Sequence, residues 1–234
     1  MKRVFEAIQE EVVSCRRCPR LVAWREEVAV TRRRAYRDQT YWGRPVPAFG
    51  DPGGRILVLG LAPAAHGANR TGRQFTGDSS GDWLFRALHR AGFANQAESV
   101  SREDGLQLTD LLITSPARCA PPGNKPTREE LKACSSYLMD ELRLLKRIEL
   151  IVALGGIAWN TYLGTVRAMG LEVPSPKPKF GHLAYVDEGL PHRLLGSFHP
   201  SRLNTQTGRL TEAMLDEVFF TARERLGPPP ERVP

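Results

Sequence analysis

Three apolar runs along the chain each lead into a segment with helical periodicity. Short, continuous apolar runs are typical of strands that are buried on both faces of a parallel sheet. We expect these strands at residues 55–61, 108–118 and 149–156. We expect the helices that follow them over residues 80–91, from 127 to about 147, and in the segment that ends near 169.

The helix that begins after Thr127 has the clearest start signal. Thr127 and Glu130 have the spacing of a capping box, in which the hydroxyl accepts from a first-turn N–H and the glutamate reaches back to the cap. The face that follows is apolar and is formed by Leu131, Cys134, Leu138, Leu142 and Leu145. Cys134 is therefore expected to point inward.

The remaining segments complete an alternation of strands and helices. Further helices are expected over residues 3–14, 25–37 and roughly 210–226, and "HLAYV" is expected to pair locally with "HRLLGSF". This order predicts an α/β fold, a three-layer α/β/α sandwich around a central, mostly parallel four-stranded sheet. We expect a single domain over 1–226 and a flexible tail over 227–234.

Three irregular loops follow the predicted strands, at residues 60–79, 115–126 and 199–209. In open parallel sheets, ligands bind at the carboxyl ends of the strands, where these loops would meet. Neither a dinucleotide-binding G-x-G-x-x-G nor the GK[ST] of a P-loop is present. His199 directly follows a strand in a polar loop, which favours a functional role over a structural one.

The charge of the chain is concentrated near its N-terminus. Residues 1–50 carry 11 Lys or Arg and 6 Asp or Glu, which accounts for +5 of the overall net charge of +7. Arginine dominates the basic residues, and it suits phosphate oxygens. The charge is consistent with nucleic-acid binding or with a solvated surface. No apolar run is long enough for a transmembrane helix and no secretory signal is visible, so we expect a cytoplasmic protein without a membrane partner.

The four cysteines form one clip and one distant pair. Cys15 and Cys18 are separated by two residues, so both sulfurs can reach one metal. Cys119 and Cys134 would flank a loop and a helix start. Four cysteines without a histidine ligand pattern suit a [4Fe–4S] cluster or a Zn(Cys)4 site, and the spacing does not separate the two. Four unrelated buried cysteines are the alternative.

Several motifs together resemble the uracil-DNA glycosylase superfamily, and most closely its iron–sulfur, B-type or family 5 enzymes. The first motif reads Gly60-Leu61-Ala62-Pro63, and the second reads His199-Pro200-Ser201. "TGRQFTGDSSG" matches the loop whose aromatic residue, here Phe75, stacks on the extracted base. "RCAPPGNKPT" matches the segment that holds a cluster cysteine, Cys119, and an active-site asparagine, Asn124.

The resemblance implies a DNA repair enzyme that flips a damaged nucleotide out of the stack and cleaves its N-glycosidic bond. His199 would stabilise the departing base anion, and Leu203 would fill the vacated stack. Ser201, Arg202 and Arg209 would hold phosphates. The resemblance also implies a structural [4Fe–4S] cluster, in preference to zinc, on Cys15, Cys18, Cys119 and Cys134.

Two departures from the superfamily pattern concern the water and the base. Ala62 stands where an acid usually positions water, and we expect Asp78 to supply the missing carboxylate. The alternative is that Asp78 only caps the next helix. Ala64 stands where strict uracil enzymes have a tyrosine, and Ser115 lies near the position of the usual base-reading asparagine. A pocket formed by Gly60, Ala62, Pro63 and Ala64 is roomier, so we expect uracil first, with hypoxanthine or ethenocytosine as further substrates.

Two other functions fit parts of the sequence. A non-catalytic iron–sulfur or zinc protein that binds DNA would explain Ala62, but it leaves Phe75, Asn124 and His199 without a role. A zinc-dependent nucleobase deaminase would need the H-x-E…P-C-x-x-C pattern, which is missing. We therefore expect a monomeric, monofunctional glycosylase that acts on DNA and is associated with the nucleoid through it.

Overall fold

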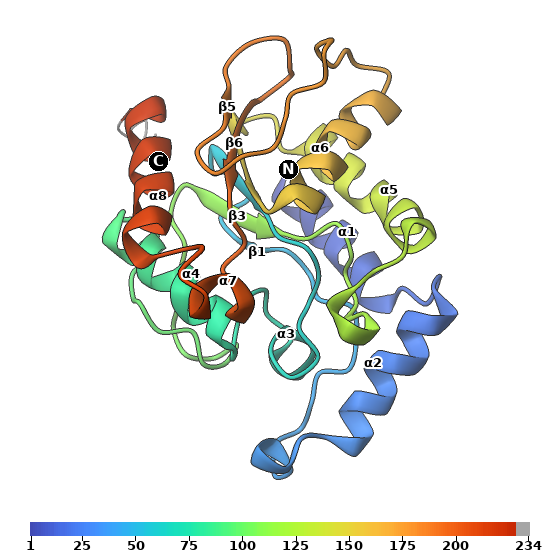
Figure 1. Ribbon diagram of the computed structural model, residues 1–234. Helices are drawn as coiled ribbons and strands as arrows, with labels where there is room; N and C mark the ends of the chain where they lie inside the picture. The colour runs from blue at the N-terminus through green and yellow to red at the C-terminus, as the bar shows by residue number, and fades with distance from the viewer. Residues whose placement is uncertain (228–234) are drawn as a thin grey trace.

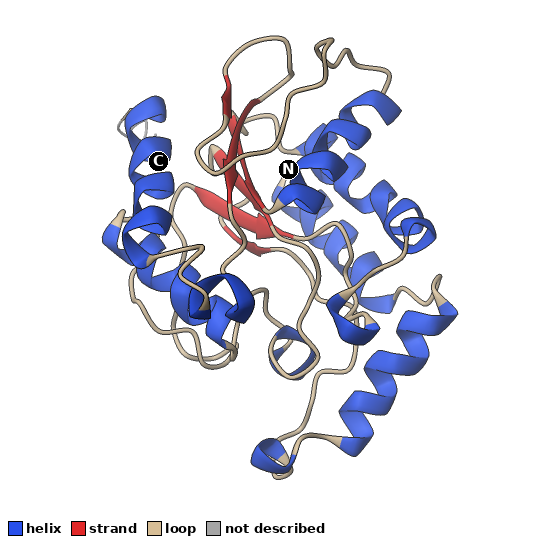
Figure 2. Ribbon diagram, viewed as in Figure 1, coloured by secondary structure: helices blue, strands red, loops and turns tan. Residues whose placement is uncertain are grey.

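The computed structural model describes residues 1–227. Its centre is one sheet with the strand order β1-β3-β2-β4-β6-β5 (Figure 2). Four neighbouring strands are parallel: β3 (Leu111–Thr114), β2 (Ile56–Leu59), β4 (Leu150–Leu154) and β6 (Arg193–Ser197). The predicted fold class is confirmed, because these four strands form the core of the sheet.

A two-residue strand is added in antiparallel fashion at each edge of the sheet. β5 (Tyr185–Val186) pairs with β6, as the local pairing of their segments predicts. β1 (Phe49–Gly50) pairs with β3 and lies inside a Pro/Gly-rich connection for which no strand is expected. The sheet therefore has six strands, and the two edge strands are too short to show a sequence pattern.

Helices cover both faces of the sheet (Figure 1). One face packs on α4 (Ser79–Arg90) and α8 (Glu212–Leu226), and the other packs on α1 (Lys2–Ser14), α5 (Arg128–Leu144) and α6 (Gly156–Ala168). Alternate residues of β2 point to opposite faces, so Ile56 and Val58 join the first core and Leu57 and Leu59 the second. This is why the strands read as continuous apolar runs.

The second helix differs from its prediction. It was expected over 25–37, but α2 runs from Pro19 to Thr31 and only a 3-10 turn, Arg34–Tyr36, follows it. Proline is well suited to the first helical position because its missing N–H needs no partner there. The helix ends where Arg32 takes a φ of 52°, in the left-handed region.

The structure agrees more closely with the other local signals in the sequence. The capping box of Thr127 and Glu130 is present at the start of α5, with both of its hydrogen bonds. Three short helical segments lie in the loops after the strands: α3 (Ala68–Thr71), the 3-10 turn Pro122–Asn124, and α7 (Arg202–Gln206). Among the described residues, none of the helices has the length and apolarity that crossing a membrane requires. The predicted tail lies, from residue 228 on, outside the described residues.

Candidate active site

The loops that follow β2, β3 and β6 meet at the carboxyl edge of the sheet. The first carries α3, the second carries the turn Pro122–Asn124, and the third carries α7 (Figure 1). Because the three strands are parallel, their loops leave the sheet on the same side. The fold therefore gathers the three polar loops that the sequence singles out.

A cavity of about 620 Å³ lies among these loops, and we call it the Asp78 cavity. Four of the predicted site residues line it and come from all three loops: Ala64, Asp78, Asn124 and Arg202. The wall also includes Tyr36, His66 and Trp83, which the sequence analysis does not single out. Residues separated by more than 100 positions in the sequence thus share one cavity.

Asp78 uses its two carboxylate oxygens differently. Oδ1 accepts from the N–H groups of Ser80 (2.9 Å) and Gly81 (3.2 Å) and so caps α4. Oδ2 accepts no hydrogen bond from another described residue and lies against Gly67, where a Cβ would be only 1.9 Å away. Burial raises the pKa of Asp78, although the two N–H donors oppose the shift. The capping role is therefore real, and it leaves one oxygen for chemistry.

Asn124 reaches the Asp78 cavity from an unusual backbone. Gly123 and Asn124 have φ values of 59° and 56°, in the left-handed region that glycine and asparagine tolerate best. The Asn124 side chain forms no hydrogen bond within residues 1–227, so its amide is available to a ligand.

Phe75 is held in a strained conformation next to His199. Its φ of 51° is rare for a bulky residue, and strain of this kind concentrates at functional sites. A Cβ at Gly60 would be 2.8 Å from the Phe75 ring, and a Cβ at Gly81 would be 1.8 Å from its carbonyl oxygen. The rings of Phe75 and His199 are 5.8 Å apart and inclined by 31°. Two glycines therefore permit this aromatic pair.

His199 lines a second, smaller cavity of about 250 Å³, which we call the His199 cavity. Asn204 of α7 donates to the His199 carbonyl oxygen (2.9 Å), which fixes the loop after β6. Burial lowers the pKa of His199 to about 4, so the imidazole is neutral at physiological pH. A neutral imidazole always carries one N–H and can serve as a hydrogen-bond donor.

The two cavities lie along the same segment of the chain. Leu61 lines the His199 cavity, and Ala64 to Gly67 line the Asp78 cavity. Ala62 and Pro63 stand between them, at the position of the first superfamily motif. Asp78 and His199 are thus not in one cavity, but the segment 61–67 connects them.

Ser115 is buried beside Gly60, and its hydrogen bond is internal. Its hydroxyl donates to Gln74 Oε1 at 2.9 Å, and the Gln74 amide donates to the carbonyl of Val46 at 3.3 Å. A Cβ at Gly60 would be 3.2 Å from Ser115 Oγ. The Ser115 hydroxyl proton is therefore used within the protein, and Ser115 lines neither the Asp78 cavity nor the His199 cavity.

The predicted DNA contacts lie on and around α7. Ser201 caps this helix by accepting from the N–H of Asn204 (3.4 Å), and Arg202 is exposed. Leu203 is 72% exposed, which is unusual for a leucine next to a cavity. The Arg209 guanidinium lies 4.8 Å from the Phe198 ring. These side chains face solvent and are available to a partner.

All four cysteines line one small cavity between the start of α2, the loop after β3 and α5. Cys134 faces this cavity, as its helix position predicts. Arg25 is buried against them: its Nη1 is 2.9 Å from the sulfur of Cys119, and its Nη2 donates to the carbonyl of Cys15 at 3.1 Å. Segments that are about 100 residues apart in the sequence therefore converge on four sulfur atoms.

The residues of this cavity fit a group with negative charge. The Nε of Arg25 and the Nε and Nη1 of Arg118 are buried and lack a partner among the described residues. Four thiolates around iron and sulfide would supply acceptors for these donors. Among the described residues, no set of three or more His, Cys, Asp or Glu side chains is arranged to hold a metal ion. The unpaired guanidinium donors, rather than a formed set of metal ligands, are what supports a cysteine-held group here.

Comparison with known proteins decides the family. The family model of the uracil DNA glycosylase superfamily matches residues 47–223, which include both motifs and the lining of both cavities except Arg33 and Tyr36. The chain belongs to the uracil DNA glycosylase superfamily. The matched region begins after Cys15 and Cys18, so these two cysteines lie outside the superfamily's common part.

Three bacterial relatives are similar to this chain over most of its length. The chain is 56% identical over 214 residues to a type-5 uracil-DNA glycosylase of Mycobacterium bovis, covering 91% of this chain and 78% of the relative. A type-5 uracil-DNA glycosylase of Mycobacterium leprae is 53% identical over 223 residues (94% and 95%). That of Thermus thermophilus is 51% identical over 222 residues (95% and 98%).

In this member of the uracil DNA glycosylase superfamily, His66 is a cavity residue that sequence reasoning missed. The backbone N–H of Arg33 donates to the Tyr41 hydroxyl (3.3 Å), and this hydroxyl shares a hydrogen bond with His66 Nδ1 at 3.0 Å. Burial lowers the pKa of His66, with a smaller contribution from Arg33, so it stays neutral. The signal in the sequence that could have indicated His66 is its position two residues after Ala64, which is itself a predicted site residue.

Proposed function

We propose that this protein is a type-5 uracil-DNA glycosylase, which hydrolyses the N-glycosidic bond of uracil in DNA and leaves an abasic site. The observation that carries the proposal is the shared wall of the Asp78 cavity. Asp78 and Asn124 come from different loops and line it together, and the segment 61–67 leads from it to the Phe75–His199 pair.

Phe75 and His199 are suited to the departing base. An aromatic ring that stacks on a base contributes roughly 1–3 kcal/mol. As the bond to the sugar breaks, negative charge develops on the base oxygens. The neutral imidazole of His199 donates a hydrogen bond to this charge, and the donor is in place before the reaction begins.

Asp78 and Asn124 are suited to the sugar side of the bond. Asp78 Oδ2 is the oxygen that the helix cap leaves without a donor. It orients or deprotonates the attacking water, or stabilises the positive charge that develops on the sugar. The Asn124 amide, in the same cavity, hydrogen-bonds to the same water or to the base. If Asp78 supplies the carboxylate, the reaction does not require an acid at the position of Ala62.

The residues of α7 are suited to extracting the nucleotide. Leu203 projects into solvent and can fill the space that the flipped nucleotide leaves, which offsets part of the unstacking cost. Ser201, Arg202 and Arg209 would hold the phosphates on either side, and the exposure of the two arginines supports this role.

A gel assay tests the proposed function directly. Duplex DNA with one uracil is incubated with the protein and then treated with hot alkali, which cleaves at abasic sites. We expect a cleaved strand only with the uracil-containing duplex and only after alkali. Binding without cleavage would contradict the glycosylase function and support the non-catalytic DNA-binding alternative.

We expect the substrate range to depend on Ala64. A panel of uracil, hypoxanthine, ethenocytosine and thymine opposite guanine should show uracil as the best substrate and measurable excision of one or both of the next two. Ala64→Tyr should reduce the excision of the non-uracil bases by about 10–100-fold relative to uracil, because the ring occupies the space beside the base. Ala64→Ser is the control and should keep the native range. Excision of uracil alone by the native protein would contradict this proposal.

We propose that Cys15, Cys18, Cys119 and Cys134 hold a structural [4Fe–4S] cluster. The convergence of all four cysteines on one cavity, with unpaired donors of Arg25 and Arg118 beside it, supports this proposal. The bound cluster would cross-link the start of α2 to the loop after β3 and to α5. Brown colour and iron content distinguish iron from zinc.

Cys119→Ser should remove the visible absorbance and lower the melting temperature by about 10 °C. This decrease in melting temperature follows from the loss of a cross-link that contributes about 2–5 kcal/mol to the free energy of unfolding in a chain of this length. Ser135→Ala, a change next to Cys134 in the same helix, is the control and should preserve colour and stability. Full colour and iron content in Cys119→Ser would contradict the assignment of this ligand.

We also propose that the protein is a single domain over 1–226, that it is a monomer, and that it is located in the cytoplasm near the nucleoid. Size-exclusion chromatography with light scattering measures the oligomeric state.

A further inference from the structure

Five arginines with no ionic partner lie on one side of the Asp78 cavity. They are exposed, and none forms an ion pair with another described residue: Arg33, Arg34, Arg37, Arg44 and Arg102. Two acids, Asp38 and Glu103, lie near them in the sequence. Glu103 lines the same cavity as Arg44 and Arg102, but five arginines outnumber two acids, so the region keeps a net positive charge.

Trp42 forms a rigid centre within this group. Its indole Nε1 donates to the carbonyl of Pro45 at 3.0 Å, and its backbone N–H donates to the carbonyl of Arg70 at 2.9 Å. Gly72 has a φ of 76°, and a Cβ there would be 2.7 Å from the indole ring. The ring is thus fixed by hydrogen bonds and by contact with a glycine.

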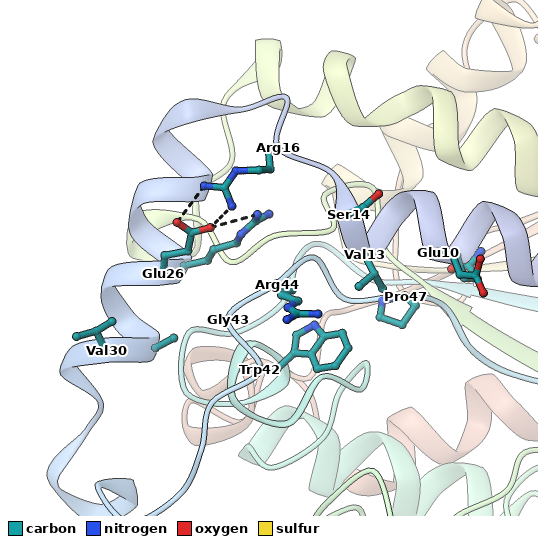
Figure 3. A pocket seen from close by; sticks show the side chains of 13 residues that line it. Glu10, Val13, Ser14, Arg16, Glu26, Val30, Trp42, Gly43, Arg44 and Pro47 are labelled. Atoms are coloured by element: carbon teal, nitrogen blue, oxygen red, sulfur yellow. Dashed lines mark hydrogen bonds and ion pairs between the residues drawn. The ribbon is translucent and has the colours of Figure 1, made fainter.

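Two of the free arginines are held against this ring. The Arg102 guanidinium lies 4.5 Å from the Trp42 ring centroid, and that of Arg44 lies 5.7 Å from it. Figure 3 shows Arg44 beside Trp42 at the edge of a groove between α1, α2 and the segment 42–47. In the same groove, Arg16 pairs with Glu26 and Arg25 lies 3.7 Å from Glu26, so Arg44 is the arginine of this groove without an ion pair among the described residues.

The same residues are continuous with the Asp78 cavity. Arg33 and Tyr36 line that cavity. The Arg70 guanidinium lies 4.1 Å from the Tyr36 ring and donates to Gln39 Oε1 at 2.6 Å. A neighbouring cavity of about 480 Å³ is lined by Gln39, Trp42, Arg44, Arg70 and Arg102. The surface from Arg33 to Arg102 therefore leads away from the cavity without interruption.

We propose that Arg33, Trp42, Arg44 and Arg102, which we call the arginine–tryptophan stripe, bind the DNA backbone on one side of the lesion. This proposal rests on the proposed function. Guanidinium groups match phosphate geometry, and arginines already held on an aromatic ring lose little freedom on binding. The stripe begins at the cavity that takes the damaged nucleotide, so the flanking nucleotides of the same DNA pass over it. Tyr36 and Arg202 line the same cavity from different segments, and in the view of Figure 1 α7 and the turn at Arg34–Tyr36 lie on different sides of α3.

The salt dependence of DNA binding tests the stripe. Binding is measured by fluorescence anisotropy at several KCl concentrations, with a duplex that carries one abasic-site analogue. Each lost phosphate contact lowers the slope of log Kd against log salt by about 0.9. The double variant Arg44→Ala/Arg102→Ala should lower the slope by about 2 and raise Kd at least ~10-fold at low salt.

A matched double variant controls for net charge. Arg147 and Arg167 are also exposed and unpaired among the described residues, but Arg147 precedes β4 and Arg167 ends α6, near the opposite edge of the sheet. Arg147→Ala/Arg167→Ala removes the same charge and should leave the slope near the native value. Equal slopes and equal Kd values for the two double variants would overturn the proposal.

Duplexes shortened on one side of the lesion locate the contact. The difference between the native protein and Arg44→Ala/Arg102→Ala should disappear when one particular flank is removed and persist when the other is removed. A difference that survives both truncations would overturn the proposal. In single-turnover excision, the half-saturating concentration should rise at least ~10-fold while the maximal rate falls by less than about two-fold. If the native protein excises no uracil, the proposed function fails, but the salt slopes still report on the stripe.

Discussion

Asp78→Asn is expected to slow single-turnover excision of uracil by about 10²–10⁴-fold, the range for the loss of a general acid–base group. Asparagine caps helices about as well as aspartate, so α4 should keep its start and the protein its stability. The loss would then come from Oδ2, the oxygen that the cap does not use. The measurement is a rapid-quench time course with enzyme in excess over DNA.

Asp82→Asn is the matched control for this substitution. Asp82 is exposed in the first turn of the same helix. Its substitution removes the same charge from the same helix end. It should leave excision within about two-fold of native, which corresponds to about 0.4 kcal/mol. Full activity of Asp78→Asn would show that Asp78 acts only as the cap.

The pH dependence provides a second test of Asp78. Because burial raises the pKa of this carboxyl, the reactive carboxylate is lost as pH falls through a value above the usual range for aspartate. Excision by the native protein should therefore decline in mild acid, and the decline should be missing from the residual activity of Asp78→Asn. An unchanged acid limb in the variant would contradict the assignment.

His199→Ala is expected to slow excision by about 10²–10³-fold, as for the removal of one donor to a developing anion. His199→Gln, which keeps an N–H donor, should recover part of the rate. His89→Ala, an exposed histidine in the last turn of α4, is the control and should behave as native. The maximal rate, rather than the half-saturating DNA concentration, should carry the loss, because the anion exists only during bond cleavage.

The protonation state of His199 can be measured without activity. With a pKa of about 4, its imidazole stays neutral as pH falls through 6.5, where an ordinary histidine becomes charged. Nitrogen chemical shifts of the labelled protein should therefore show a neutral ring at pH 6. A charged ring at that pH would contradict the role of a neutral donor, and it would point to a cationic histidine opposite the base.

Much of the arrangement of strands and helices could be predicted from local patterns in the sequence. β2, β3 and β4 are recognisable because a strand that is buried on both faces must be apolar at every position. The start of α5 is recognisable because its capping box satisfies the free N–H groups with neighbours in the sequence. The order of strands and helices then implies a parallel sheet with its loops on one edge. The bounds of α2 were not predictable in this way, because its charged residues continue past the point at which Arg32 ends it.

The sequence by itself determined which chemical groups this protein has and near which strand ends they lie. His199 could be chosen because its loop follows a strand, whereas Asn124 was chosen from the family resemblance and Asp78 from the acid that is missing at Ala62. Only the tertiary structure decided that Asp78 divides its oxygens between a helix cap and a cavity, and that His199 lies in a neighbouring cavity with a depressed pKa. It also placed His66 and Arg33 in the wall of the Asp78 cavity, and Arg44 and Arg102 around Trp42 beside a neighbouring cavity. Burial, cavity shape and contacts over long sequence distances arise from packing, and no local pattern encodes them.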